Sequence, residues 1–220
     1  MNKELVEYIE AEIFPRYERF YSHGLDHIQR VIETAQMLGE TYGLDKDILY
    51  AAAACHDLGL KVNRKHHEEE SGKIVAADER LPEFFSADAL KLIKEAVEDH
   101  RGSRKERPRS MYGCVISDAD RDFDVATLAR RNLATSIRNY LDVTTFEGHF
   151  ERCYEYLMQR VKGEHFNLWT EHPELVRQRE EYEKTFFDKE RTREIYRQAW
   201  EMMESKGIIE KILNGYYEDF

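Results

Sequence analysis

The sequence predicts an all-α protein, with a helical core and a C-terminal helical extension, and three observations lead to this fold class. Only 4 prolines and 11 glycines interrupt the 220 residues of the chain. Apolar residues recur at steps of three and four nearly everywhere, and valine, isoleucine and threonine alternate with polar residues over no useful length. Apolar residues make up 41% of the chain, which is enough for a substantial core.

Each predicted helix is marked by an apolar stripe and by residues that begin or end it. Gly43 is expected to end the helix over 25–42, because glycine readily adopts the left-handed conformation that closes helices. Asp45 is expected to cap the next helix, which the pattern extends to about Leu58 with Gly59 as its stop. The predicted helices cover residues 3–15, 25–42, 46–58, 66–79, 86–100, 110–120, 124–140, 145–162 and 173–213, the last with breaks.

No change of composition marks a firm domain boundary, so we expect a single all-α domain over residues 1–220. Its core is expected at about 20–125 and its helical extension at about 140–220.

The extension offers two further predictions. The charged amphipathic helix pattern of 181–203 could pair with the same segment of a second copy, so a homo-oligomer is possible. The extension is rich in aromatic residues, which are expected to pack in the core, with covering the mouth of a site as the alternative: Tyr140, Phe146, Phe150, Tyr154, Tyr156, His165, Phe166 and Trp169.

Composition and charge exclude several classes of function. The net charge of −11 opposes binding to nucleic-acid polymers, because an acidic surface repels their phosphates. No segment has the length and apolarity of a membrane span or a secretory signal. The cysteines Cys55, Cys114 and Cys153 form no CxxC pair, which is typical of reduced thiols rather than of a zinc ribbon or a disulfide framework. We therefore expect a cytoplasmic protein without a membrane or nucleic-acid partner.

The segment AAAACHDLGL, residues 51–60, is the most informative part of the sequence. The apolar run that begins at Ile48 leads directly into His56 and Asp57, which are costly side chains to bury. A buried carboxylate requires a partner or a metal ion. Adjacent residues on a helix point about 100° apart, so this pair could hold one ion from two sides but could not complete its shell. The other ligands must come from other helices.

Candidate partners for this pair lie in two other segments. His27 lies in YSHGLDHIQRV, and Asp118 and Asp120 follow an apolar run in CVISDADR. A mixed set of imidazole and carboxylate ligands suits Mn, Mg, Fe, Co, Ni or Zn, with water in the open positions. Taken singly, His27 could instead be a hydrogen-bonded core residue, and the two aspartates could be a helix cap and a surface charge.

The ordered pattern of His27, His56-Asp57 and Asp120 resembles the HD-domain superfamily of metal-dependent phosphohydrolases. The segments DHIQRV, ACHDLGL and DADR are similar to local motifs of that family, and they occur in the same order. In the family the last ligand follows a small residue and precedes a basic one, which selects Asp120 over Asp118. The resemblance implies that His27, His56, Asp57 and Asp120 bind a divalent metal ion.

The resemblance covers roughly residues 20–125 and implies a reaction as well as a fold with a five-helix core. It implies a hydrolase that uses metal-activated water on a small phosphorylated metabolite, a nucleotide being one candidate. Both phosphate monoester and pyrophosphate bonds fit. Asp57 would orient the water, Asp120 would be a ligand and a proton acceptor, and His100 has a catalytic counterpart in some relatives.

Substrate-binding residues are expected on either side of this set. His66 and His67 occupy a region where several HD relatives place histidines that bind a second metal or contact phosphate. The loop RGSRKERPRS carries a local charge of +4, and its residues Arg101, Arg104 and Lys105 could bind phosphate oxygens. The alternative is that the histidines and this loop are simply solvated.

Two other functions remain open from the sequence. An HD-type di-iron oxygenase would need more ligands, which His66, His67 and His100 could supply in part. A helical ligand-binding module could keep the fold without catalysis. Two irons per chain without phosphatase activity would favour the first, and no turnover with any divalent metal would favour the second.

Overall fold

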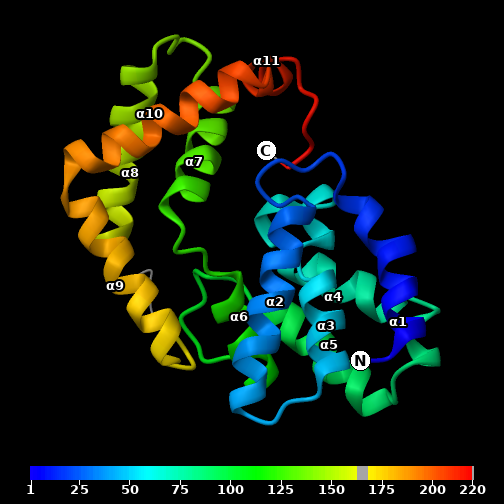
Figure 1. Cartoon of the computed structure of the whole chain (residues 1–220). Coiled ribbons are helices and arrows are strands. Elements are labelled where there is room, and N and C mark those ends of the chain that lie inside the picture. Colours follow the sequence, from blue (N-terminus) through cyan, green and yellow to red (C-terminus); the bar gives the residue numbers. More distant parts are fainter. Residues whose placement is uncertain (163–167, 220) are drawn as a thin grey trace. The chain divides into compact units, whose positions relative to one another are not determined.

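The computed structural model describes residues 1–162 and 168–219 and confirms the all-α class (Figure 1). Every regular element in these two ranges is a helix, and no strand is found in them. His165 and Phe166, which were predicted to pack in the core, lie outside the described residues.

The chain divides into two compact units, each of which is described by itself. The first unit comprises Met1–Arg121 together with Asp219, and the second comprises Asp122–Glu218. The division therefore lies a few residues before the predicted end of the core, at about 125. The chain enters the second unit after Arg121 and returns to the first at Asp219.

The first unit contains six α-helices and the short turns that connect them. α1 (Lys3–Tyr8) continues into a π-helix (Ile9–Ile13) and a 3-10 turn (Phe14–Tyr17). The remaining α-helices are α2 (Leu25–Thr41), α3 (Lys46–Cys55), α4 (His67–Ala77), α5 (Ala87–Asp99) and α6 (Met111–Asp120). Three further 3-10 turns cover Leu58–Lys61, Arg64–His66 and Leu81–Glu83.

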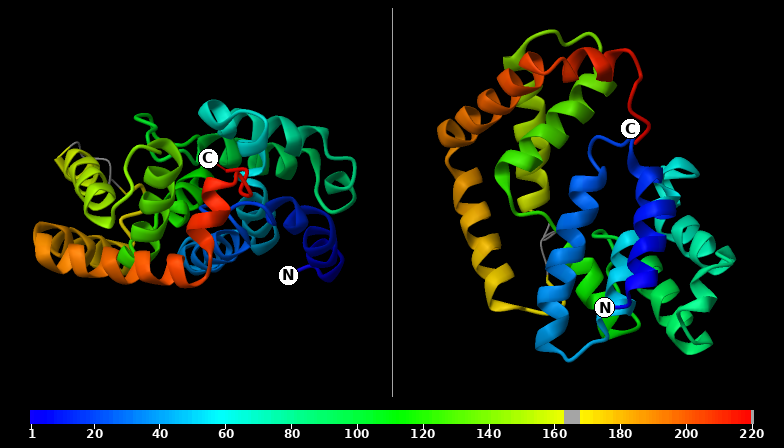
Figure 2. Two further views of the ribbon diagram at one scale, coloured as in Figure 1. Left: turned by 90° about the horizontal axis from the view of Figure 1, so that it is seen from above. Right: turned by 45° about the vertical axis from the view of Figure 1, so that its right-hand side comes forward.

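Helix α3 forms the centre of the first unit. All eight residues from Ile48 to Cys55 are buried, as their uninterrupted apolar pattern predicts. Helices α2, α5 and α6 pack against α3, and α4 packs against α5 (Figures 1 and 2). Ile28 and Leu38 from α2 and Ile93 from α5 are fully buried. Burying each such side chain contributes roughly 1.5–3 kcal/mol.

The predicted connection between α2 and α3 is confirmed by its backbone geometry. Gly43 has φ of +62°, the left-handed conformation expected where α2 ends. The Asp45 carboxylate accepts hydrogen bonds from the backbone N–H groups of Asp47 and Ile48, at 2.8 and 3.1 Å, and so caps α3.

The end of α3 differs from the prediction. The helix ends at Cys55 instead of about Leu58, so His56 and Asp57 lie in the turn that follows it. Gly59 does not stop α3, because it lies in the 3-10 turn Leu58–Lys61, and α4 approaches its backbone closely. A Cβ atom added to Gly59 would lie 2.2 Å from the carbonyl oxygen of His67 and 2.6 Å from the backbone nitrogen of Ser71. The glycine is needed for this approach, which brings His67 beside Asp57.

The second unit contains α7 (Val125–Asn139), α8 (Phe146–Lys162), α9 (Pro173–Phe187), α10 (Lys189–Ser205) and α11 (Ile208–Leu213). Helices α7, α8 and α10 pack against one another. Core packing was predicted correctly for Phe146 and Phe150, which are buried, and wrongly for Tyr140 and Tyr156, which are 41% and 50% exposed.

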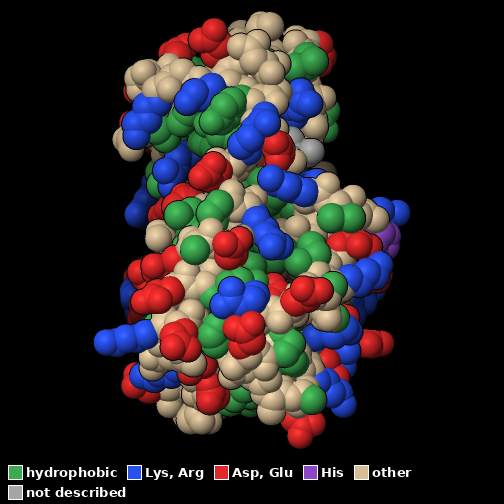
Figure 3. All heavy atoms as spheres, turned by 90° about the vertical axis from the view of Figure 1, so that its right-hand side faces the viewer, with side chains coloured by type: hydrophobic (Ala, Val, Ile, Leu, Met, Phe, Trp, Pro, Cys, Tyr) green, Lys and Arg blue, Asp and Glu red, His purple; other side chains and the backbone are tan. Residues whose placement is uncertain are grey.

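The face of the molecule drawn in Figure 3 is mixed in charge. On this face, acidic and basic side chains are interspersed and hydrophobic side chains form small separate areas. Within the two described ranges, no helix combines the length and the apolarity that crossing a bilayer would require.

Candidate metal centre

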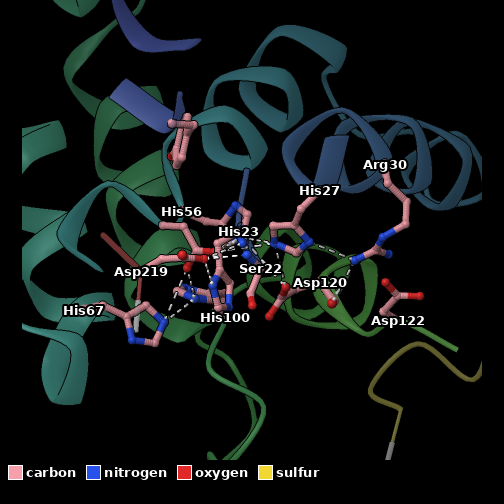
Figure 4. A network of polar contacts seen from close by, with 12 residues as sticks. Ser22, His23, His27, Arg30, His56, His67, His100, Asp120, Asp122 and Asp219 are labelled. Carbon is pink, nitrogen blue, oxygen red and sulfur yellow. Dashed lines mark hydrogen bonds and ion pairs between the residues drawn. The ribbon is translucent and has the colours of Figure 1, made fainter. Parts of the chain in front are cut away.

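The four predicted metal ligands lie together in the first unit. His27 is in the first turn of α2, His56 and Asp57 follow α3, and Asp120 is the last residue of α6. His27 Nε2 lies 3.4 Å from Asp57 Oδ2 and 3.3 Å from Asp120 Oδ1. His56 Nε2 lies 3.2 Å from Asp57 Oδ2 and 3.7 Å from Asp120 Oδ1. His27, His56 and Asp120 are labelled in Figure 4. Asp118 is buried but is not part of a metal-ligating group in the described residues.

A second group of ligands shares Asp57 with the first. The other carboxylate oxygen, Oδ1, lies 3.5 Å from His67 Nε2 and 3.6 Å from His100 Nε2. The two imidazole nitrogens are 3.2 Å apart. His67 begins α4 and His100 directly follows α5. One carboxylate therefore faces two pairs of histidines, with a different oxygen directed to each pair.

Three of these histidines are oriented in the same way. The Nδ1–H groups of His56, His67 and His100 each face the carbonyl oxygen three residues earlier, at 2.7, 3.1 and 2.5 Å. A carbonyl can only accept, so each of these Nδ1 atoms donates. In the neutral ring this leaves Nε2 with its lone pair directed toward Asp57. Hydrogen bonds of this kind are typical of histidines that ligate metals, because they fix the tautomer and the ring orientation.

Arg30 aligns the fourth histidine and the end of α6. Its guanidinium lies 3.2 Å from His27 Nδ1. The same group donates to the carbonyl oxygens of Ala119, Asp120 and Arg121, at 2.9, 3.1 and 3.2 Å. These bonds fix the last turn of α6 against α2, so Arg30 sets the position of Asp120 relative to His27.

The centre is buried, and its charges strongly affect one another. The side chains of His56, His27 and Asp57 are 0%, 1% and 3% exposed, whereas that of Asp120 is 27% exposed. Burial disfavours the imidazolium of His56, but the neighbouring carboxylates of Asp57 and Asp120 outweigh this effect and raise its pKa to about 10. Burial also opposes ionisation of both carboxyl groups, yet the surrounding histidines hold the pKa of Asp57 and of Asp120 well below the usual range.

The residues of the centre fit a divalent metal ion. Asp57 Oδ2 is buried and accepts no hydrogen bond, although an unsatisfied buried carboxylate oxygen is costly. Nitrogen and oxygen donors from separate segments form three groups whose ligand atoms lie within 4.8 Å of one another: His27, His56 and Asp57; His56, His100 and Asp120; and Asp57, His67 and His100. These groups could hold one ion, or two ions bridged by Asp57.

The predicted substrate-binding residues are only partly brought to the centre. His67 is a member of the second group, whereas His66 is about half exposed and lies 3.9 Å from Glu69. Lys105 is exposed. The guanidinium groups of Arg101 and Arg104 pair with Glu68 at 2.9 Å and with Asp99 at 3.1 Å. A phosphate bound by these two arginines would have to compete with carboxylates.

The lining of a pocket with a volume of about 720 Å³ includes Glu68 and Arg101, which directly follow His67 and His100 in the sequence. Arg101 and Arg104 line it, together with Arg109, Lys73 and Lys94. Three glutamates also line it: Glu68, Glu69 and Glu98. The lining thus carries five basic and three acidic side chains, and each basic one pairs with a carboxylate, so an anionic ligand would have to displace these partners.

Sequence reasoning missed several residues that hold the centre in place. Asp99 is fully buried and accepts from the Arg109 backbone N–H at 2.7 Å and from its guanidinium at 3.0 Å, which anchors the basic loop next to His100. Asp219 accepts hydrogen bonds from the loop before α2. The position of Asp99 directly before His100 is a weak sequence signal, whereas the position of Asp219 carries none.

The helical fold and the buried cluster define a class: an all-α protein with a histidine and aspartate centre that could hold a divalent metal. Residues 24–122, a little under half of the chain, match the family model described as HD domain. This segment therefore matches the HD domain, the family that the order of its histidines and aspartates resembles, and that family is one of metal-dependent hydrolase-like proteins.

One relative and one negative finding accompany this match. An uncharacterized protein of Clostridium beijerinckii is 29% identical over 99 residues, which are 42% of this chain and 62% of that relative. The chain thus spans less than two thirds of the length of the curated relative it matches. No solved structure is significantly similar to the chain.

Proposed function

We propose that this protein is a metal-dependent phosphohydrolase that uses metal-activated water on a small phosphorylated metabolite. The observation that carries the proposal is the bridging position of Asp57, whose two oxygens face His27 and His56 on one side and His67 and His100 on the other. When bound, a divalent ion supplies a nucleophile at neutral pH, because it lowers the pKa of water from 15.7 to about 7.

The exposure of each side chain indicates its role in the proposed reaction. Asp57 is buried and bridges the two ligand groups, so its role is to hold the metal ion and to orient the water. Asp120 is the more exposed carboxylate, and we assign it the role of accepting a proton from water. His100 was predicted to be catalytic. Its burial and its hydrogen bond to the Val97 carbonyl favour the role of a ligand in the second group.

The pocket lined by Arg101 and Arg104 supports a small anionic substrate. Its volume of about 720 Å³ is suited to a nucleotide or a sugar phosphate. Arg101 and Arg104 would bind phosphate oxygens after exchanging their present carboxylate partners. The proposal includes a monoester or a pyrophosphate bond as the target, a cytoplasmic location, and no membrane or nucleic-acid polymer as a partner.

The experiment is a screen of the full chain against nucleotides and sugar phosphates, after reconstitution with Mn²⁺, Mg²⁺, Co²⁺, Ni²⁺, Fe²⁺ or Zn²⁺. The decisive variant is Asp57→Asn, which keeps the shape of the side chain and removes its charge. The matched control is Asp88→Asn, the same change at an exposed position in the first turn of α5. Turnover should fall at least 100-fold in Asp57→Asn while its circular dichroism stays unchanged. Equal turnover in the two variants would reject the proposal.

The bridging carboxylate also favours a second candidate function, a di-iron oxygenase. Two ligand groups that share one carboxylate are a suitable arrangement for a pair of irons. The iron-loaded protein separates the candidates: two irons per chain with oxygen consumption and no release of phosphate would favour the oxygenase. Metal binding without any turnover would favour a ligand-binding module.

A further inference from the structure

A buried carboxylate near the far end of the chain, that of Asp219, lies in the first unit. Asp219 lies 196 residues beyond His23 in the sequence, and its side chain is 0% exposed. Its Oδ1 accepts from the backbone N–H of Tyr21 at 2.8 Å. Its Oδ2 accepts from the N–H groups of Ser22 and His23, at 2.6 and 2.9 Å (Figure 4). These bonds fix the backbone of the loop directly before α2.

The same carboxylate also fixes the His23 side chain. His23 Nδ1 lies 3.2 Å from Asp219 Oδ2, and its ring packs edge-to-face on His27 with a centroid distance of 5.6 Å. Burial opposes ionisation of Asp219, but its hydrogen bonds to His23 and to the backbone of the loop outweigh this effect and lower its pKa. Hydrogen bonds to an ionised carboxylate are stronger than neutral ones. The anchoring of Tyr21, Ser22 and His23 is therefore firm.

The backbone of Asp219 reaches the second ligand group. Its carbonyl oxygen accepts a hydrogen bond from the Arg64 guanidinium. Arg64 begins the 3-10 turn that precedes α4, and its own carbonyl accepts the Nδ1–H of His67. Asp219 thus links the loop that leads to His27 with the turn that leads to His67. These histidines belong to the two groups that face opposite oxygens of Asp57.

We propose that Asp219 is a positioning residue of the metal centre, holding the loop before α2 and the turn before α4 so that His27 and His67 both face Asp57. No ligand lies near it in sequence, so the first unit alone, cut after Arg121, would lack this anchor. The inference rests on the metal centre of the proposed function but not on its reaction. It is therefore tested by metal binding and backbone protection, with no substrate.

The test compares the full chain with Asp219→Asn and with a matched control, Asp142→Asn, at an exposed position in the turn after α7. Hydrogen exchange is measured on the metal-free proteins, and Co²⁺ affinity from its visible absorption. Asp219→Asn should speed exchange at Tyr21, Ser22 and His23 by tenfold or more and weaken Co²⁺ binding by about tenfold, the lower end for residues that orient metal ligands. Asp142→Asn should change neither.

A third variant, His23→Ala, separates the two routes through which Asp219 could act. If the backbone bonds dominate, His23→Ala keeps slow exchange at residues 21–23 and keeps Co²⁺ affinity within threefold of the unaltered chain. Faster exchange spread evenly over α2 to α6 in Asp219→Asn would overturn the proposal, since it would show general destabilisation instead of local positioning. Unchanged exchange and affinity would overturn it as well. Turnover lost in every metal form with Co²⁺ binding intact would count against the proposed reaction alone.

Discussion

Adding a single methyl group at Gly59 should disturb the second ligand group and leave the first one in place. The backbone N–H of Gly59 donates to Ser71 Oγ at 2.8 Å, and α4 passes so close that there is no room for a side chain. A Cβ atom at this position would lie 2.2 Å from the His67 carbonyl oxygen, where ordinary contact begins at about 3.4 Å. In Gly59→Ala, the start of α4 must therefore retreat by about 1 Å.

The direction of this movement determines which ligands are affected. His67 is the first residue of α4, and its Nε2 lies 3.5 Å from Asp57 Oδ1. His27 and His56 face the other oxygen and are attached to α2 and α3, which do not need to move. Overpacking against backbone atoms costs roughly 1–3 kcal/mol of unfolding free energy. We expect a loss of about 2 kcal/mol in unfolding free energy, together with selective loss of an ion bound between His67 and His100.

The assay combines urea unfolding of the metal-free protein with metal content after reconstitution and desalting. Gly43→Ala is the matched control, because it adds the same methyl group where no atom lies within 4 Å. Its φ of +62° is unfavourable for alanine and costs about 1 kcal/mol by itself. Both variants are destabilised, but only Gly59→Ala should lose metal from the second group.

Two outcomes would refute this reasoning. If Gly59→Ala binds the same number of ions as the unaltered chain, α4 does not control the second group. If Gly43→Ala loses as much metal as Gly59→Ala, metal loss simply follows lower stability. We expect the metal content to fall by one ion per chain in Gly59→Ala and to stay unchanged in Gly43→Ala.

Two further predictions concern the same centre. In His67→Ala the metal content should fall by one ion per chain, whereas His66→Ala should keep it, since His66 lies outside the ligand groups; equal losses by elemental analysis would contradict this. The raised pKa of His56 stabilises the metal-free fold fully below about pH 6.5, and this contribution is lost as pH rises towards 10. Urea unfolding with EDTA should therefore show stability decreasing over that range, and a His56→Gln variant should show a weaker decrease.

Much of the first unit could be predicted because its signals are local. The apolar run that ends at Cys55 identified the central helix, and Asp45 and Gly43 identified the turn before it. The order of His27, His56-Asp57 and Asp120 indicated the ligands through a family resemblance, which the HD-domain match supports. Helix ends were less predictable, as the early end of α3 shows, because close packing of α4 on Gly59 overrides the local helical pattern.

The residues that position the centre were hidden because their partners are distant in the sequence. Arg30 was visible only as a basic residue three positions after His27, and nothing local indicates that it contacts the carbonyls at the end of α6. The basic loop was predicted without its buried partner Asp99, and the pairing of Asp99 with Arg109 neutralises part of the charge that suggested phosphate binding. Charge counted along the sequence overestimates the charge available to a ligand.

The shared carboxylate explains why costly side chains follow the most apolar helix of the protein. Asp57 can serve two ligand groups only from the middle of the unit, where the starts of α2 and α4 and the ends of α5 and α6 converge. There its charge is shielded from water, which is unfavourable without a cation but strengthens attraction to one. The burial that makes the metal-free centre costly is therefore the same property that would hold a divalent ion firmly, and α3 supplies the rigid apolar support that this position requires.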